Sequence, residues 1–200
     1  TRPEHIRLLY EKVNGHAYED VLAGRADRRA PPPRPVEYTA AASSNMRAMP
    51  MVQNPGPTMI GERVNTQGSR KVKQLILDGD YDSVLPIALG QVEAGAHMLD
   101  VCVALTERAD EAAQMRALVR KLAMSVEVPL IIDVTDPDVA EAALSVYPGR
   151  GIINGNNLEN GRERIDQVLP IALKYGAAVL SMTIDEVGMA HTREGKLAIA

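Results

Sequence analysis

The chain of 200 residues is long enough to bury a substantial core, and its hydrophobic fraction of 46% is ordinary for a globular protein. Its formal charge of -4 argues against a nucleic-acid-binding surface, which needs a concentrated basic face, and no apolar run approaches the length of a membrane span. The single cysteine, Cys102, excludes an internal disulfide. Together with a first segment that lacks the organisation of a signal peptide, it predicts a cytoplasmic protein.

The first 57 residues have the pattern of a short helix and a linker. Residues 3–13 carry apolar side chains at helical spacing and predict one terminal helix, too short to form a domain. From Ala30 the chain reads Ala-Pro-Pro-Pro-Arg-Pro, and proline at this density favours extended backbone. We therefore expect residues 1–23 to be the end of another domain, and residues 24–57 to be a Pro-rich linker largely without regular structure.

Five strands are predicted after residue 57, and each ends in a polar residue. The strands and their end residues are 58–64 with Asn65, 97–99 with Asp100, 129–132 with Asp133, 151–153 with Asn154, and 177–184 with Asp185. A helix-like pattern follows each strand, and alternation of strands with helices predicts a parallel sheet covered by helices. In such folds ligands bind at the carboxyl ends of the strands, so these five side chains are expected to line one pocket.

The helix boundaries have recognisable signals. Ser69 is a candidate N-cap, Asp136-Pro137 begins a later helix, and Gly176 is a candidate C-cap. An open sheet and a barrel both fit the strand pattern, but uniform β-α spacing without a glycine-rich first turn favours the barrel. Since a barrel needs eight strands, we expect residues 58–200 to be the first five β/α units of a (β/α)8 TIM barrel in a longer protein.

Five motifs carry a resemblance to a known family. They are Gly-Glu-Arg-Val-Asn-Thr-Gln-Gly at 61–68, Gly-Ala-His-Met-Leu-Asp-Val at 95–101, Pro-Leu-Ile-Ile-Asp at 129–133, Gly-Arg-Gly-Ile-Ile-Asn at 149–154, and Asp-Glu-Val-Gly-Met-Ala-His-Thr-Arg at 185–193. In order and spacing they resemble the pterin-binding family, and within it the methyltetrahydrofolate domain of cobalamin-dependent methionine synthases. The resemblance implies a barrel that binds 5-methyltetrahydrofolate and positions its N5-methyl group for transfer to cob(I)alamin.

The same resemblance extends to the domain organisation. Residues 1–23 look like the C-terminal remnant of the homocysteine-binding domain of those enzymes, and residues 24–57 look like their interdomain linker. Cobalamin would then be bound by another domain of the same polypeptide, and zinc would belong to the homocysteine domain, outside this chain. His5 and His16 have no cysteine or acidic partners in the sequence and are predicted to be surface residues, so no metal site is expected here.

The resemblance also assigns roles to the strand-end residues. It implies pterin contacts for Asn65, Asp100, Asp133, Asn154 and Asp185, with Asp133 and Asn154 as the residues closest to catalysis. An ionised carboxylate can accept two hydrogen bonds from adjacent pterin N–H groups, and an amide offers a donor and an acceptor together. The alternative for each residue is a structural role in a turn or cap. For Asp133 that alternative is weaker, because Asp136 is better placed to cap the next helix.

Two departures from the family pattern bear on how the pterin is positioned. Cys102 stands where relatives commonly carry asparagine, and it is predicted to be a small buried residue, not a nucleophile. The run Gly155-Asn156-Asn157 replaces a serine-containing run. Other functions remain open at this point: a methyltransferase acting on a corrinoid iron-sulfur protein, a folate-binding module inert in isolation, or a plain α/β scaffold. Dihydropteroate synthase shares the pocket, but its characteristic Pro-Asp-Ser-Phe and Ser-Thr-Arg-Pro motifs are missing.

Overall fold

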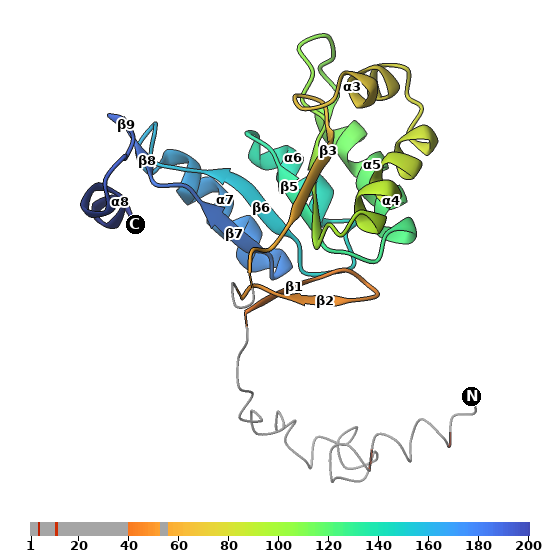
Figure 1. The fold of residues 1–200 in the computed structure, drawn as a ribbon, viewed down its shortest axis with the longest axis horizontal. Coiled ribbons are helices and arrows are strands. Elements are labelled where there is room, and N and C mark those ends of the chain that lie inside the picture. Colours follow the sequence, from red (N-terminus) through yellow and green to blue (C-terminus); the bar gives the residue numbers. More distant parts are fainter. Residues whose placement is uncertain (1–3, 5–10, 12–39, 53–55) are drawn as a thin grey trace. The chain divides into compact units, whose positions relative to one another are not determined.

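The computed structural model describes residues 4, 11, 40–52 and 56–200 (Figure 1). The chain divides into two compact units, residues 1–38 and 39–200, and every element discussed below belongs to the second. The predicted terminal helix lies almost wholly outside the described residues, and so does the proline run that begins the predicted linker.

A five-stranded parallel sheet forms the centre of the second unit, as predicted. Its strands pair in chain order, β3-β4-β5-β6-β7, and every neighbouring pair is parallel. This order is that of a barrel, because an open doubly wound sheet reverses its strand order at a switch point. The strands are β3 Ile60–Asn65, β4 Met98–Cys102, β5 Leu130–Asp133, β6 Ile152–Asn156 and β7 Ala178–Ser181.

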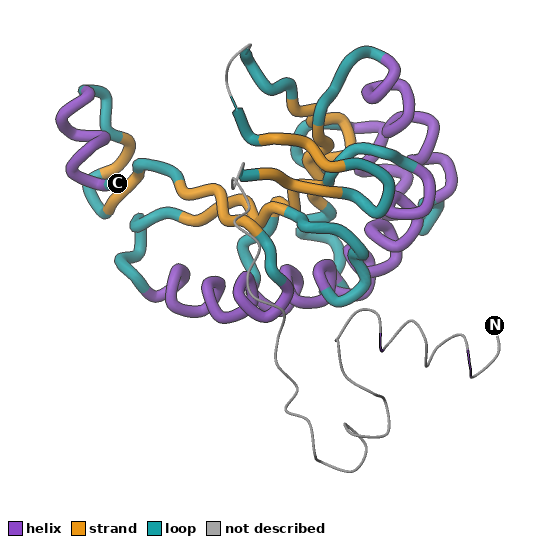
Figure 2. The backbone as a smooth tube through the Cα atoms, turned by 90° about the horizontal axis from the view of Figure 1, so that it is seen from below, coloured by secondary structure: helices purple, strands orange, loops and turns teal. Residues whose placement is uncertain are grey.

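The helices from α3 to α7 lie along the outer side of the curved row of strands, and the C-terminal helix α8 lies apart, next to the β8–β9 hairpin (Figure 2). They are α3 Arg70–Leu77, the 3-10 turn η1 Asp82–Val84, α4 Leu85–Glu93, α5 Glu111–Ser125, α6 Pro137–Leu144, α7 Glu163–Tyr175 and α8 Arg193–Ile199. The predicted boundaries are confirmed: the Ser69 hydroxyl accepts from the Val72 N–H, Asp136 accepts from the Asp138 N–H, and Gly176 ends α7 at φ 66°. The chain is therefore a partial (β/α)8 barrel.

The prediction of a strand over residues 177–184 is wrong, because the observed strand is shorter. Strand β7 stops at Ser181, and the chain then forms a separate two-stranded hairpin of β8 Ile184–Asp185 and β9 Gly188–Met189. Apolar residues continue through this stretch, so the hydrophobic pattern alone did not mark the break.

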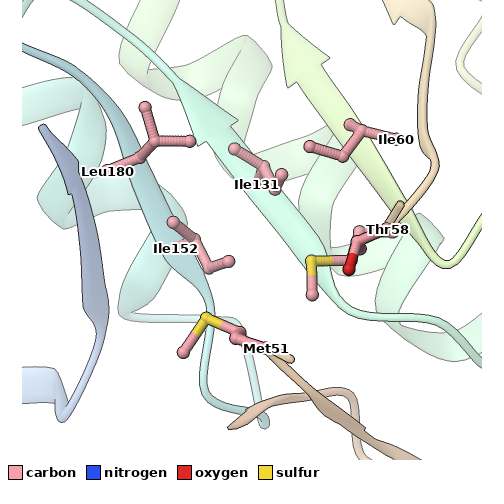
Figure 3. Close-up of a pocket in the computed structure, with 7 residues that line it drawn as sticks. Met51, Thr58, Ile60, Ile131, Ile152 and Leu180 are labelled. Carbon is pink, nitrogen blue, oxygen red and sulfur yellow. The ribbon is translucent and has the colours of Figure 1, made fainter. Parts of the chain in front are cut away.

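Alternation along the strands divides their side chains between two apolar layers. Residues such as Leu99, Val101 and Ile132 face outward and join the large core under the helices. Their neighbours Met98 and Ile131 face inward and form a second cluster. The inward layer borders a cavity of about 170 Å³ (Figure 3), which is lined by Met51, Thr58, Ile60, Met98, Ile131, Ile152 and Leu180.

A β-hairpin packs against the inward layer, and for residues 41–50 the expectation of a linker without regular structure is wrong. Strands β1 Ala41–Ser43 and β2 Ala48–Pro50 pair antiparallel, and Ala42 is completely buried among Met98, Ile131 and Ile152. Inward apolar side chains near the amino ends of the strands would otherwise face water, and the hairpin covers them. The proline run itself lies outside the described residues, and the composition of the linker carried no information about what residues 41–50 pack on.

Several hydrogen bonds hold the hairpin to the loops of the sheet. The Ser43 N–H donates to the Arg150 carbonyl at 3.0 Å, and the Ser44 hydroxyl donates to the Glu127 carbonyl at 2.7 Å. The Tyr147 hydroxyl donates to the Ser43 carbonyl at 2.9 Å and accepts from the Leu130 N–H at 3.1 Å. Tyr147 thus joins the hairpin to the start of β5 through one buried oxygen.

We predict that Tyr147→Phe loosens the hairpin, because it leaves a buried N–H and a carbonyl without their shared partner. In the intact protein the cost should be about 1–3 kcal/mol of local stability. Amide hydrogen exchange at residues 41–51 measures it. Tyr175→Phe is the matched control, since that hydroxyl meets only a half-exposed Glu141 carboxylate at 3.3 Å. Unchanged exchange at the hairpin in Tyr147→Phe would show that the Tyr147 hydroxyl does not help to hold it.

Candidate functional site

Four of the five predicted site residues come together at the carboxyl ends of β3 to β6. The Asn65 side-chain amide donates to Asp100 Oδ2 at 2.8 Å and to Asp133 Oδ2 at 3.3 Å. Asp133 and Asn154 are register partners on adjacent strands. Two carboxylates and two amides, contributed by four consecutive strands, therefore form one polar cluster, which we call the strand-end cluster.

Asn65 is held by its own turn as well as by the two carboxylates. Its Oδ1 accepts from the backbone N–H groups of Gln67, at 2.8 Å, and Gly68, at 3.3 Å. Strict alternation would place Asn65 on the face opposite Ile60, but a bulge between Gly61 and Val64 shifts the register by one residue. The bulge thus turns Asn65 inward, and the turn then orients its amide toward Asp100 and Asp133.

Asp100 is the deepest member of the strand-end cluster, with only 5% of its surface exposed. Burial is the main cause that raises its pKa to about 6, and the nearby charges of Asp133 and Glu62 act in the same direction. Hydrogen bonding by the Asn65 and Asn154 side chains opposes the increase in pKa. Asp100 is thus a carboxyl group that changes charge just below neutral pH.

Asp133 and Asn154 form the outer, half-buried part of the cluster. Asn154 Oδ1 accepts from the Gly155 N–H at 2.7 Å, which fixes the orientation of the side-chain amide. Asp133 Oδ2 accepts from the Asn65 amide at 3.3 Å, which is longer than the 2.8 Å bond from the same amide to Asp100. The outer pair therefore offers a carboxylate and an amide side by side to whatever approaches the ends of the strands.

Asp185 lies in the β8–β9 hairpin, away from these contacts. Its Oδ1 accepts from the Val187 N–H at 3.0 Å, and it borders a pocket formed with residues of α8. No hydrogen bond among the described residues links it to the strand-end cluster. Its pterin contact stays a prediction.

Cys102 is buried beside the strand-end cluster. Burial raises the pKa of its thiol, which keeps it protonated and disfavours a nucleophilic role. The Thr66 hydroxyl donates to the Ala104 carbonyl at 2.8 Å and lies 3.9 Å from Cys102 Sγ. Gln67 Nε2 donates to the same carbonyl at 3.0 Å. These bonds tie the loop after β3 to the loop after β4.

Sequence reasoning missed two charged residues near the strand-end cluster. Glu62 follows Gly61 on β3 and acts electrostatically on Asp100. Arg164, in the first turn of α7, reaches the carbonyls that follow β5. Nothing in a single sequence signals the second residue, because it is some thirty positions from its partners.

Neither a metal centre nor a membrane span is found in the described part of the chain. No group of three or more His, Cys, Asp or Glu residues there is arranged to hold a metal ion. None of the helices within residues 40–52 and 56–200 is long and apolar enough to cross a bilayer.

We predict a pH-dependent stability that Asp100→Asn removes. An acid with an unperturbed pKa of 3.8 and a folded-state pKa of about 6 stabilises the fold only while it is protonated. Its contribution is complete below about pH 4 and is lost as the pH rises through about 6, at a cost of up to about 3 kcal/mol. Relative to the unsubstituted protein, the variant should therefore gain stability between about pH 4 and pH 7.

Denaturant unfolding of the barrel in the intact protein at several pH values measures this gain. Other carboxylates, such as Asp110 with a pKa lowered to about 2 by Arg108, are common to both proteins and cancel in the difference. A stability difference that does not change with pH would mean that Asp100 titrates normally in the folded protein.

Comparisons with known proteins identify the family to which the chain belongs. Residues 61–199 match the model of the family described as pterin binding enzymes. Over an alignment of 203 residues that includes the whole chain, the sequence is 36% identical to methionine synthase of Mycobacterium leprae (strain TN). Identity to methionine synthase of Mycobacterium tuberculosis (strain ATCC 25618 / H37Rv) is also 36% over 203 residues. The chain spans only 16% of the length of either relative.

Solved dihydropteroate synthases share the fold. The Yersinia pestis enzyme, solved with a pterine-sulfa conjugate, aligns with a TM-score of 0.52 at 20% identity, over 73% of this chain and 50% of its own. The Xanthomonas albilineans enzyme gives 0.52 at 17% identity, over 76% and 53%. Identity this low establishes the shared architecture alone. From the family match, which covers more than half of its residues, the chain belongs to the pterin binding enzymes.

Proposed function

We propose that the chain binds 5-methyltetrahydrofolate and holds its N5-methyl group for transfer to a corrinoid carried by another domain of the same polypeptide. The observation that carries this proposal is the strand-end cluster, in which Asn65 joins Asp100 and Asp133 at the carboxyl ends of the strands of a pterin-binding-family barrel. The methionine synthases to which the whole chain is similar support the choice of reaction.

The outer pair of the cluster fits the donor-rich edge of a pterin ring. That edge presents a ring N–H beside an exocyclic amino group, and one carboxylate accepts both with charge-assisted strength. Asp133 is the more accessible of the two carboxylates, so it is assigned this contact. Asn154 lies next to Asp133 across the sheet and supplies an amide for the neighbouring polar atoms of the ring. Asn65 and Asp100 support them from beneath.

Methyl transfer from N5 breaks a carbon–nitrogen bond, and the electron pair of that bond stays on the nitrogen. An amine is a poor leaving group unless it gains a proton as the bond breaks. The task of the strand-end cluster is to fix the ring and, through its negative charge, to favour the protonated amine while the methyl face stays open. The corrinoid supplies the nucleophile when its domain is docked, so no nucleophilic side chain is required of this chain.

The remaining assignments belong to the same proposal. Residues 1–23 are the end of a homocysteine-binding domain that holds zinc outside this chain, residues 24–57 include the linker, and the enzyme is cytoplasmic. The corrinoid iron-sulfur protein methyltransferase performs the same chemistry. Similarity to methionine synthases along the whole chain, including residues before 58, favours the multidomain synthase.

We predict that Asp133→Asn in the intact protein weakens 5-methyltetrahydrofolate binding. The substitution preserves shape but turns one acceptor oxygen into a donor that faces the N–H groups of the pterin. Losing a charge-assisted hydrogen bond and creating an unmatched donor should cost about 2–4 kcal/mol. That is roughly a thirty- to several-hundred-fold loss of affinity. Titration with 5-methyltetrahydrofolate gives the affinity directly.

Asp138→Asn is the matched control, because Asp138 is exposed in the first turn of α6 and outside the cluster. Homocysteine binding should be unchanged in both variants. Near-normal folate affinity in Asp133→Asn would remove the central contact of the proposal, and failure of the unsubstituted protein to bind the folate would refute the function itself.

A further inference from the structure

We propose that Arg164, seated over Gly155, is a positioning residue that fixes the orientation of Asp133 for pterin recognition. The inference rests on the proposed function and adds to it a pair of residues that contact neither pterin nor methyl group. It explains how a carboxylate at the end of a strand, next to a loop, keeps the geometry that a two-point hydrogen bond needs.

The guanidinium group of Arg164 binds the backbone that follows Asp133. Its Nη2 donates to the Val134 carbonyl and its Nη1 to the Thr135 carbonyl. On either side of these two residues, Asp133 is held in the sheet opposite Asn154, and Asp136 caps helix α6. Four consecutive residues are therefore fixed, and the direction in which the Asp133 side chain leaves the backbone is fixed with them.

Gly155 makes room for this contact. It lies in a bulge of β6 with φ at +89°, a conformation that favours glycine. A Cβ atom there would lie 3.0 Å from the Val134 carbonyl oxygen and 3.2 Å from Arg164 Nη2. Any larger residue would therefore push against the guanidinium and the carbonyl that it binds. Glycine at position 155, in the run that replaces the serine-containing run of relatives, thus leaves the room that the Arg164 guanidinium occupies.

The charge of Arg164 acts on the strand-end cluster without occupying it. Burial lowers the pKa of the guanidinium, while the carboxylates of Asp133 and Asp136 favour its charged form. Among the ion pairs of the described residues, none joins Arg164 to Asp133, so the guanidinium does not compete with a pterin for the carboxylate oxygens. Within the same residues its Nε has no hydrogen-bond partner, so the two carbonyls alone hold the group.

Binding of 5-methyltetrahydrofolate to variants of the intact protein tests the inference, at a temperature well below the unfolding midpoint of each. Arg164→Ala should weaken binding about ten- to a hundred-fold, because small misplacements of a positioned group are costly. Arg164→Lys, which keeps the charge but loses the fork, should weaken it about three- to ten-fold. Arg162→Ala is the matched control: Arg162 is exposed, precedes the same helix and forms an ion pair with Asp166 at 3.2 Å, so binding should stay within about twofold.

The route through Gly155 is tested by a double-mutant cycle. Gly155→Ala should weaken binding about as much as Arg164→Ala. The double variant should bind the folate no more weakly than the single variant with the lower affinity, because both changes break the same contact. If the two losses of affinity multiply in the double variant, Gly155 and Arg164 are not coupled. If Arg164→Lys binds the folate as tightly as the unsubstituted protein, the two guanidinium hydrogen bonds are not needed to position Asp133. The Lys variant keeps the test decisive if Arg164→Ala fails to fold.

A pH profile separates positioning from support of the fold. Asp133 interacts electrostatically with Asp100 on β4 and with Arg164 on α7; Glu62 on β3 acts on Asp100, and Asp136 acts on Arg164. Removing the only cation of this set should move the acid limb of folate binding to higher pH in Arg164→Ala, and not in Arg164→Lys. An unmoved limb in both variants, with affinities within twofold, would overturn the proposal while leaving the folate function intact. If the unsubstituted protein does not bind the folate, both proposals fall together.

Discussion

The amide of Asn65, bonded to two carboxylates at once, is the interaction on which the rest of the site depends. Asp100 and Asp133 come from adjacent strands and repel each other, and the Asn65 amide group donates one N–H to each. Its oxygen is held in turn by the backbone of Gln67 and Gly68. Every hydrogen-bonding position of this side chain is occupied within the protein. Within the protein, Asn65 therefore holds the two carboxylates in place, and its pterin contact stays a prediction.

The inner face of the sheet is divided along the strands into an apolar and a polar layer. Near the amino ends, Met98 and Ile131 are covered by the β1–β2 hairpin; two residues further along, the same face carries Asp100 and Asp133. Asp100 is itself buried in the polar layer, and this burial is the main cause of its raised pKa. The hairpin covers the apolar half of this face and leaves the polar half to the strand-end cluster.

The two carboxylates of the strand-end cluster differ in burial and in the charges that lie near them. Asp100 is buried and near two other negative charges, whereas Asp133 is half-exposed and has the cation of Arg164 behind its loop. Burial makes Asp100 take up a proton more readily than a free carboxyl group, and the half-exposed Asp133 is the carboxyl group that an approaching ligand can reach. In the proposed function, Asp133 therefore accepts from the donor-rich edge of the ring.

Local pattern in the sequence determined much of this protein. Short apolar runs located the five strands, although the last was predicted too long, and polar residues at four of their ends located the candidate site. Ser69, Asp136 and Gly176 marked helix ends through bonds within a few residues. The tertiary structure alone decided what depends on distant contacts or on register. Three such features have no signal in the periodicity of the sequence: the bulge that turns Asn65 inward, the hairpin that covers Met98, and the contact of Arg164 with Val134. Each joins segments far apart in the chain, where packing and not local preference selects the partner.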